Sequence, residues 1–402
     1  MNKKSIFIAI ALMVLGPAGI STTLAAAPVV QQSTAPASNS TDDKALYAQY
    51  QVWLGRRNFD ELDKAGNQLL TRYRAKEITA DTLTSQLLLM VPNDPKMLLG
   101  DTEAWVKAKP KSYTAHYVLG VDYIALARQA RGGKLARDTS SAQIAEMERY
   151  FGQALEMLNK SIALDTKPYP SYRSLVTIAG MLGDHAAADM ALSNAVKTDL
   201  DATGAYLRYI EYNTPRWGGD YNKLEKLLVS ARKSGMSKQN LAVLESEILV
   251  WRARDEVMYS KNPGRAVDYW LAAYKANPGK QQVGHLYAAA SDAKAAKQID
   301  RALAIYTQIA TEFKDEDTAF ALRGNLYHEE KQDYKRAFDD FLVAANMGNK
   351  FSQNNVGFYY MTGKAGMTDL VLARKYFQLS ADQGFDHAKE KLKLLDAMQA
   401  KK

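Results

Sequence analysis

Two stretches of the chain decide its fold: ALEMLNKSIALD (Ala154–Asp165) and ADMALSNAVKTD (Ala188–Asp199). Aligned at an offset of 34 residues, they match in their small residues, their leucines and their closing aspartates. Tyr172 and Tyr206 keep the same offset. Within each stretch, apolar residues recur at three- and four-residue spacing, which is typical of amphipathic helices. A period of this length indicates a stacked array of helix pairs.

The unit that begins near Tyr169 resembles the tetratricopeptide repeat, a pair of antiparallel helices with small residues where the helices approach each other. Tyr172 and Leu175 stand on its expected first helix, Gly183 in the turn, and Ala188 on the second helix. The resemblance implies an all-α fold, a right-handed helix-turn-helix solenoid.

A shorter form of the pattern returns in the last third of the chain. A small residue stands four positions before an aromatic one at spacings of 36, 35 and 36: Ala266 and Trp270, Ala302 and Tyr306, Ala337 and Phe341, Ala373 and Phe377. The region from about Asp317 to Leu394 resembles Sel-one-like repeats, with AANMGN and SADQGFDHAK ending two units and TGKAGMTD as the loop insertion of that family. The lysine-rich end, KEKLKLLDAMQAKK, predicts a polar cap on the array.

One turn departs from the repeat pattern. In the unit that contains Tyr206, the second-helix residues lie two positions late, and PRWGG (215–219) occupies the enlarged interval. The proline disfavours helix before it, the glycines permit positive φ, and Asp220 can cap the next helix. We expect Trp217 to fold back as a plug over the end of the helix pair. The alternative is that Arg216 and Trp217 form a ligand-facing pair.

The region from about Leu46 to Arg252 resembles an uncharacterised bacterial domain family that is often followed by short repeats. PRWGG and ALARQARGG (125–133) carry this resemblance, which implies an architecture and no reaction. RGGKLAR (131–137) predicts a mobile, exposed linker, with an anionic-ligand loop as the alternative. The candidates for partner contact are Arg216, Trp217, Arg128, Arg131 and Arg173.

The first residues, MNKKSIFIAIALMVLGPAGISTTLAAAP, have two lysines, an apolar run and closing alanines, the layout of a bacterial secretory signal. Cleavage after Ala25 or Ala26 is expected, and no later apolar stretch reaches membrane-spanning length. We therefore predict a periplasmic or secreted protein with no membrane span after signal cleavage. The predicted organisation is a signal peptide (1–26), a flexible leader (27–40), a helical domain with tetratricopeptide-like repeats (41–260) and a tetratricopeptide/Sel-one-like repeat domain (261–402).

Composition excludes several classes of function. The 402 residues contain 52 Lys and Arg against 44 Asp and Glu, and loss of Lys3 and Lys4 with the signal lowers the net charge from +8 to +6. This excess is scattered along the chain, so we expect no nucleic-acid partner. The chain has no cysteine, which excludes disulfides, thiolate nucleophiles and zinc–thiolate sites.

Catalytic motifs are missing from the sequence. It contains no Gly-x-Ser-x-Gly elbow, no His-Glu-x-x-His, no phosphate loop and no dinucleotide fingerprint. The acidic run Asp315–Asp317 lacks the glycine and the spaced carboxylates of a calcium loop, so we interpret it as a solvated loop and helix cap. The five histidines are far apart in sequence: His116, His185, His285, His328 and His387. We predict no catalytic residue, no metal and no cofactor.

The sequence therefore favours an exported scaffold for protein–protein interaction, whose helical repeats offer a concave surface to a peptide or protein partner. The alternative is an enzyme or small-ligand receptor with a pocket near the turn from Pro215 to Gly219 and the basic loop near Arg131.

Overall fold

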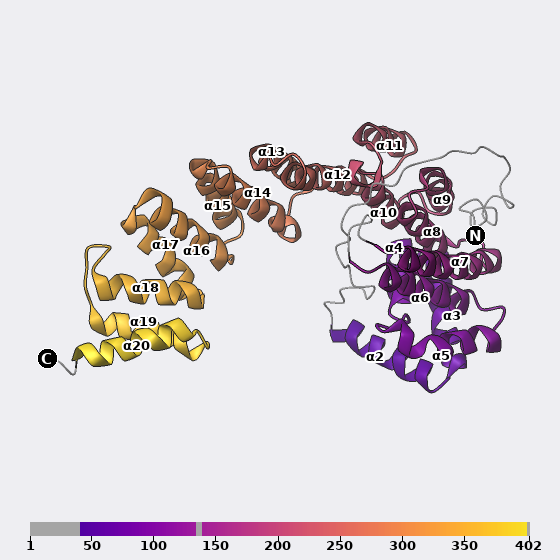
Figure 1. Cartoon of the computed structure of the whole chain (residues 1–402), viewed down its shortest axis with the longest axis horizontal. Coiled ribbons are helices and arrows are strands. Elements are labelled where there is room, and N and C mark those ends of the chain that lie inside the picture. Colours follow the sequence, from indigo (N-terminus) through magenta and orange to yellow (C-terminus); the bar gives the residue numbers. More distant parts are fainter. Residues whose placement is uncertain (1–40, 134–138, 400–402) are drawn as a thin grey trace. The chain divides into compact units, whose positions relative to one another are not determined.

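The computed structural model describes residues 41–133 and 139–399 (Figure 1). Within these residues every regular element is a helix, which confirms the predicted all-α helical-repeat fold. A search of the same residues finds no helix with the length and apolar character needed to cross a bilayer. The predicted signal peptide, the leader and residues 134–137 of the RGGKLAR stretch lie outside the described residues.

The chain forms two compact units that divide between Ile248 and Leu249, inside α12 (Lys238–Met258). The boundary predicted at residues 260 and 261 lies just beyond the end of that helix. Unit 1 contains α2 (Thr41–Gly55), α3 (Phe59–Arg74), α4 (Ala80–Leu88), α5 (Pro95–Ala108), α6 (Tyr113–Arg131), α7 (Ser141–Leu164), α8 (Tyr169–Met181), α9 (His185–Thr198), α10 (Gly204–Tyr212), the 3₁₀ turn η2 (Pro215–Trp217) and α11 (Tyr221–Lys233).

Unit 2 is also built from helix pairs, in which a first helix is followed by an antiparallel second helix. It contains α13 (Pro263–Ala276), the 3₁₀ turn η3 (Lys280–Gln282), α14 (Val283–Ala295), α15 (Ile299–Glu312), α16 (Asp317–Leu326), the π-helix η4 (Tyr327–Lys331), α17 (Tyr334–Asn346), α18 (Lys350–Thr362), α19 (Leu370–Asp382) and α20 (Asp386–Gln399). Each helix packs against the next one along the chain, from α13 to α20. Residues 389–399 of the lysine-rich end lie in α20, the last helix of this array.

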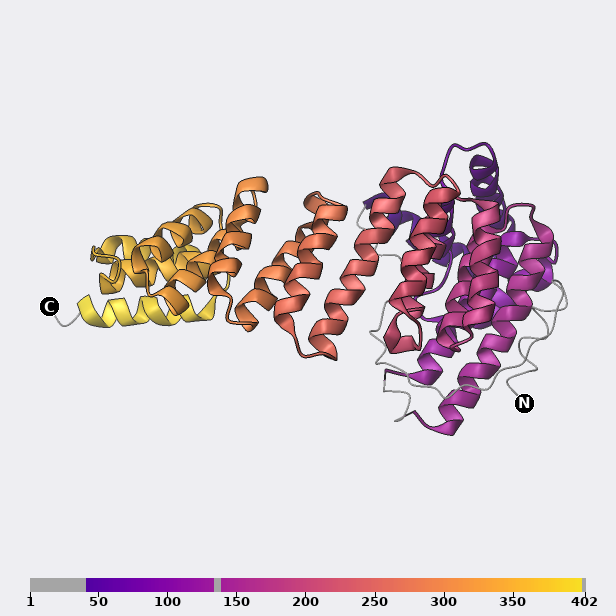
Figure 2. The ribbon, with the colours of Figure 1, turned by 90° about the horizontal axis from the view of Figure 1, so that it is seen from above.

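In unit 1 the first helices of successive pairs lie side by side. Figure 2 shows the helices of this unit as packed rods. The longest pair is α6 and α7, and α8 pairs with α9. Because α8 also packs against both α6 and α10, these three first helices form one continuous layer. Side chains on this layer come from three different pairs.

The alanine–aromatic pattern of the sequence forms the core of unit 2. The four alanines are completely buried on the second helices of their pairs: Ala266, Ala302, Ala337 and Ala373. In the last two of these pairs, the aromatic ring four positions later presses against a glycine of the first helix. A Cβ at Gly324 would lie 2.9 Å from the Phe341 ring, and one at Gly357 would lie 2.8 Å from the Phe377 ring. The small residues are required because backbone and ring approach too closely for any larger side chain.

Helix starts and turns follow the local chemistry of the sequence. Asp184 caps α9 by accepting a hydrogen bond from the amide of Ala187 at 2.9 Å. Asp220 caps α11 by accepting from the amide of Asn222 at 3.0 Å, as the sequence predicts. Gly183 has a φ of +69° in the turn between α8 and α9. The repeat boundaries are therefore set by short-range capping as well as by packing.

One buried carboxyl group breaks the pattern of satisfied polar groups. Asp122 on α6 is fully buried, and neither of its carboxyl oxygens has a hydrogen-bond partner among the described residues. The nearby Thr102 hydroxyl donates instead to the carbonyl of Leu99 at 3.0 Å. Burial raises the pKa of Asp122 well above its ordinary value of 3.8. The folded protein therefore favours the neutral form of this group.

This burial predicts a pH-dependent stability that Asp122→Asn removes. Between the unfolded pKa and the raised folded pKa, the native state binds a proton that the unfolded state has lost, so wild-type stability falls as pH rises. Each unit of separation is equivalent to about 1.4 kcal/mol. Urea melts at several pH values between about 5 and 8 should show Asp122→Asn gaining on wild type as pH increases. Asp42→Asn, at an exposed aspartate, is the control. Parallel pH profiles for wild type and Asp122→Asn would contradict the prediction.

Candidate functional site

Four arginines stand on the first helices of unit 1, and we call them the arginine row: Arg128, Arg131, Arg173 and Arg208. Arg128, Arg131 and Arg208 interact with Tyr212, and Arg208 also acts on Arg173. The first two stand in the last turn of α6. Arg173 and Arg208 are each the fifth residue of their helices, α8 and α10, and are 35 positions apart. Because α8 packs against both α6 and α10, equivalent side chains of neighbouring pairs become spatial neighbours.

Tyr212, at the end of α10, interacts with the arginines of α6 and with Arg208 of α10. Its phenol is buried, and burial raises its pKa, while the positive charges of Arg128 and Arg208 act in the opposite direction. The phenol also acts electrostatically on Arg131. Its ring occupies the space left by Gly180, where a Cβ would lie 2.4 Å from the Tyr212 side chain. Gly180 of one helix pair thus leaves the space in which the Tyr212 ring of the next pair packs.

The start of α10 is held by a carboxylate from a distant part of the chain. Asp81 on α4 accepts hydrogen bonds from the amide of Thr203 at 2.7 Å, from its hydroxyl at 2.9 Å, and from the amide of Gly204 at 2.9 Å. The Tyr169 hydroxyl donates to the same carboxylate at 3.3 Å. Thr203, at the N-cap position, forms no side-chain cap of its own. Asp81 therefore supplies the N-terminal cap and the negative charge that a helix start favours.

Arg173 lies beside this cap without joining it. A Cβ at Gly204 would lie 2.6 Å from Oδ1 of Asp81 and 2.9 Å from Nε of Arg173, so only glycine leaves room for both. The Arg173 guanidinium forms no hydrogen bond and no ion pair with any residue in the described ranges. Burial lowers its pKa and the positive charge of Arg208 lowers it further, while Asp81 and the Tyr117 and Tyr169 phenols act in the opposite direction.

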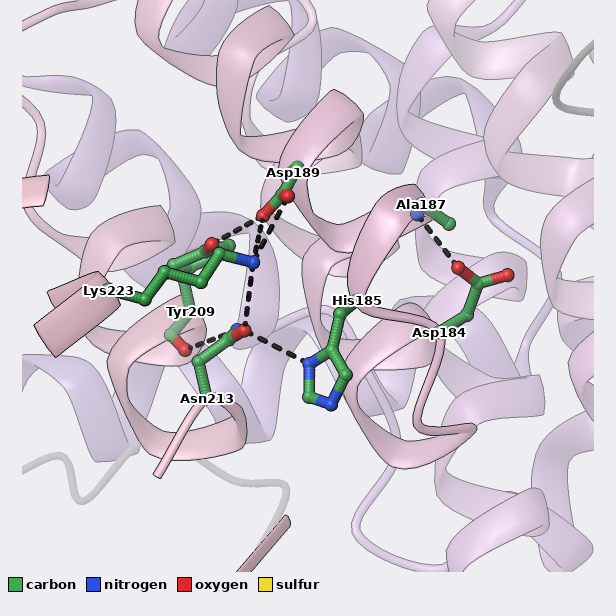
Figure 3. Close-up of polar contacts among 7 residues, drawn as sticks. All are labelled: Asp184, His185, Ala187, Asp189, Tyr209, Asn213 and Lys223. Atoms are coloured by element: carbon green, nitrogen blue, oxygen red, sulfur yellow. Dashed lines mark hydrogen bonds and ion pairs between the residues drawn. The ribbon is translucent and has the colours of Figure 1, made fainter. Parts of the chain in front are cut away.

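The PRWGG turn is held by a polar network from the preceding helix pair (Figure 3). Asn213 is fully buried, and its Nδ2 donates to the carbonyl of Tyr209 at 2.9 Å. Its Oδ1 is consequently an acceptor, 3.0 Å from Nδ1 of His185, which must carry the proton of that bond. A Cβ at Gly219 would lie 1.9 Å from the Asn213 carbonyl oxygen. The second glycine is therefore a structural requirement.

A charged group closes this network on the surface. Lys223 forms an ion pair with Asp189 at 2.8 Å and lies 3.5 Å from Oδ1 of Asn213. The Tyr209 hydroxyl donates to the same aspartate. Figure 3 shows these groups converging from α9, α10 and α11. The enlarged turn thus fastens one pair to the next.

The partner-contact candidates Arg216 and Trp217 lie in the PRWGG turn, next to the arginine row and not in it. Trp217 is partly buried and packs edge-on against Tyr212, with ring centroids 5.0 Å apart, so it covers the helix end without being enclosed. Arg216 is partly buried in the same turn. Trp217 and the arginine row therefore meet at Tyr212.

One prediction about these residues was wrong. The RGGKLAR stretch was expected to be exposed from Arg131 onward, but Arg131 is only 6 % exposed. The reason is that α6 continues through this residue, and Gly132 ends the helix with a φ of +68°. The side-chain amide of Gln143 on α7 donates to the carbonyl of Arg131 at 3.3 Å, which ties the helix end to its partner.

Sequence reasoning missed three residues of the site: Asp81, Arg208 and Tyr212. Arg208 stands 35 positions after Arg173, one more than the offset that relates Tyr172 to Tyr206, so the repeat alignment does not point to it. The partners of Asp81 lie 122 and 123 residues away, and no motif links them.

Metal-binding groups do not cluster in the part of the chain that the structure describes. Within it, no three His, Asp or Glu side chains converge into a possible metal site. The acidic run after α15 connects neighbouring pairs: Asp315 pairs with Lys280, and Asp317 accepts from Nδ2 of Asn349 at 2.9 Å.

Comparisons with known proteins give the chain no family. No protein-family model matches the sequence, and no curated protein matches it. The resemblance of residues 46–252 to an uncharacterised bacterial family therefore stays a prediction.

Several solved structures resemble the chain distantly. One is a protective antigen present in uropathogenic Escherichia coli strains displaying an SLR fold, with 16% identity, 81% of each chain covered and a TM-score of 0.31. Another is a Sel1 repeat protein from Oxalobacter formigenes, with 17% identity, 92% of this chain and 98% of that chain covered, and a TM-score of 0.30. Yeast Tom70 has 11% identity, 90% and 89% coverage, and a TM-score of 0.32. At these values the likenesses carry no argument about function.

The geometry of the turn predicts that Gly219→Ala is strongly destabilising. The added methyl group would overlap the Asn213 carbonyl, so the turn must open and lose its contacts, at a cost of about 2 to 4 kcal/mol. Gly100→Ala is the matched control, because a Cβ at this position of α5 would have no heavy atom within 4 Å. The control should gain up to about 1 kcal/mol from helix propensity. The free energies of unfolding of both variants are measured by denaturant melts. If Gly219→Ala were as stable as Gly100→Ala, the turn would tolerate a side chain and the prediction would be wrong.

Proposed function

We propose that this chain is an exported bacterial scaffold for protein–protein interaction, which presents a concave helical-repeat surface to a peptide or protein partner. The observation that carries the proposal is the arginine row on the neighbouring first helices of unit 1. Arginine and tyrosine together are enriched at the centres of protein interfaces, because both offer large contact area and directed hydrogen bonds.

The charges around the row favour an acidic partner. The acidic groups that act on its tyrosines are Asp81 and Glu211. Asp81 is engaged by the start of α10, and Glu211 forms an ion pair with Arg208 at 2.7 Å. The row therefore contains four guanidinium groups, of which Arg208 is paired with Glu211 and Arg173 lies in the field of Asp81. An acidic segment would complement the excess positive charge and would be guided to it electrostatically.

The alternative proposal is an enzyme or small-ligand receptor centred on the PRWGG turn. It is supported less well, because the polar groups of the turn bond mainly to one another. His185, Asn213 and Lys223 form a connected network with Asp189. Groups satisfied in this way hold a turn in place and leave little capacity for a substrate.

The proposed location in the periplasm, or outside the cell, depends on the first residues of the sequence. Two lysines, the apolar run from Ile6 to Leu15 and the following alanines support recognition by a secretory pathway. The absence of cysteine is compatible with an oxidising compartment.

Partner capture tests the scaffold proposal. Tagged mature protein is incubated with periplasmic extract, crosslinked and analysed by mass spectrometry. A row variant carries Arg128→Gln, Arg173→Gln and Arg208→Gln. The control variant removes the same charge at three exposed arginines of unit 1 with Arg72→Gln, Arg149→Gln and Arg232→Gln. Wild type and control should capture the same partner, and the row variant should capture about tenfold less. Equal capture by all three proteins would reject the row as the contact surface.

Export has its own test. The intact mass of protein recovered from the cell envelope should correspond to a chain that begins near Ala26 or Ala27, because signal cleavage follows small residues. Disruption of the apolar run by Ile10→Arg and Leu12→Arg should leave the full-length chain in the cytoplasm. A full-length wild-type chain held in the membrane would contradict the proposal.

A further inference from the structure

A π-helix in unit 2 presents His328 to the next helix pair. α16 runs into η4, whose wider turn occupies Tyr327–Lys331, and Gln332 ends it with a φ of +52°. π-Helical turns are rare and occur frequently at functional positions. Nδ1 of His328 lies 2.6 Å from the hydroxyl of Tyr359 on α18. The π-helix of one pair is therefore bonded directly to the first helix of the next.

The same imidazole belongs to a cluster that includes the loop between α18 and α19, at residues 363–369. The Tyr334 ring of α17 packs edge-on against His328, with ring centroids 5.4 Å apart. Lys364 of the loop places its Nζ 4.2 Å from the centroid of the same Tyr334 ring, a cation–π contact that holds the loop to α17. One tyrosine thus connects the histidine to the loop.

The hydrogen bond between His328 and Tyr359 has a defined direction. Tyr359 is only 1 % exposed, and His328 is the one partner of its hydroxyl among the described residues. A buried hydroxyl that donates to nothing costs free energy, so Tyr359 donates and Nδ1 accepts. The proton of the neutral imidazole is then on Nε2. Burial also raises the pKa of the Tyr359 phenol, so this group keeps its hydrogen at physiological pH.

Protonation of His328 removes the acceptor of this bond. A charged imidazole carries a hydrogen on both nitrogens, so the buried hydroxyl must turn away and its hydrogen loses its only acceptor. The new charge also adds to that of Lys364, which lies on the same Tyr334 ring. Burial and the charge of Lys364 lower the pKa of His328, while Glu329 acts in the opposite direction.

The other charged groups of η4 are engaged with the preceding helix pair or exposed. Glu329 forms an ion pair with Lys294 of α14 at 2.9 Å. Lys331 forms one with Asp300, in the first turn of α15, at 2.6 Å. Glu330 is exposed. The attachment of η4 to the preceding pair therefore does not require a neutral imidazole, whereas its bond to α18 does.

We propose that the His328–Tyr359 hydrogen bond is an acid-sensitive latch, which holds the loop at residues 363–369 against α17 and releases it when the imidazole is protonated. Because the pKa of His328 is lowered in the closed state, the open state binds more protons. The latch is fully stable above the ordinary histidine pKa of 6.5 and loses stability as pH falls below it. The latch lies wholly in unit 2, so its test requires no partner of the arginine row.

Hydrogen–deuterium exchange of the full chain, followed by mass spectrometry, tests the latch on the peptide that covers residues 363–369. Rates are corrected for the intrinsic pH dependence of exchange, and the turn at Gly235 in unit 1 is the internal reference. From about pH 7.5 to about pH 5.0, the corrected rate of the wild-type loop should rise about fivefold while the reference stays within about twofold. His328→Asn keeps a neutral acceptor for Tyr359 and should remove the response. His387→Gln, at an exposed histidine of α20, is the matched control and should keep it.

Lys364→Gln guards against variants that fail to fold, because the altered side chain is exposed. An NMR titration follows the His328 imidazole, assigned from the signal that His328→Asn lacks. Its midpoint should move to higher pH in Lys364→Gln, which removes a repelling charge, and in Tyr359→Phe, which removes the donor to the neutral form.

Three results would each reject the latch: a wild-type loop that does not respond to acid, a full response in His328→Asn, or loss of the response in His387→Gln. An unchanged midpoint in both Lys364→Gln and Tyr359→Phe would also overturn it, because neither group would then act on the imidazole. A histidine that only fills space between the helices predicts exactly this unchanged midpoint, so the titration separates a switch from simple packing.

Discussion

The carboxylate of Asp81 at the start of α10 is the interaction on which the site of unit 1 depends. It supplies the acceptors that the first amides of α10 lack, and it binds the Tyr169 hydroxyl of α8 at the same time. One carboxylate thus fixes the position of one first helix relative to the next. Because Asp81 is engaged by α10 and Tyr169, it is not hydrogen-bonded to Arg173, which lies beside it.

Close approach of backbone and rings determines the rest of the architecture. Gly180 seats Tyr212, and Gly357 seats Phe377 in the same way in unit 2. The Gly180–Tyr212 contact joins one pair to the next, whereas the Gly357–Phe377 contact joins the two helices of one pair, so each ring is buried by a neighbouring helix. The PRWGG turn extends this dependence through polar groups, because Asn213 and His185 connect α10 to α9. Helical-repeat proteins lose stability in neighbouring units when one such contact is removed.

Much of the fold was predictable, and the reason is visible in particular residues. Ala337 and Phe341 recur one repeat later as Ala373 and Phe377, and the helices form where that spacing places them. The cap at Asp220 and the enlarged turn before it were also predictable, because they depend on residues adjacent in sequence. Arg131 was placed wrongly because glycines after a basic residue suggest a loop, whereas burial against Gln143 extends the helix.

The sequence by itself determined the helical class, the repeat length and most turns, since these depend on interactions within a few residues and on a pattern that repeats. Tertiary structure decided which side chains form a site. It brought Asp81 to Thr203, across 122 residues, and placed Arg173 within reach of the charges of both Arg208 and Asp81. Such outcomes depend on how helices pack, and hydrogen bonds between distant residues leave no periodic trace in one sequence.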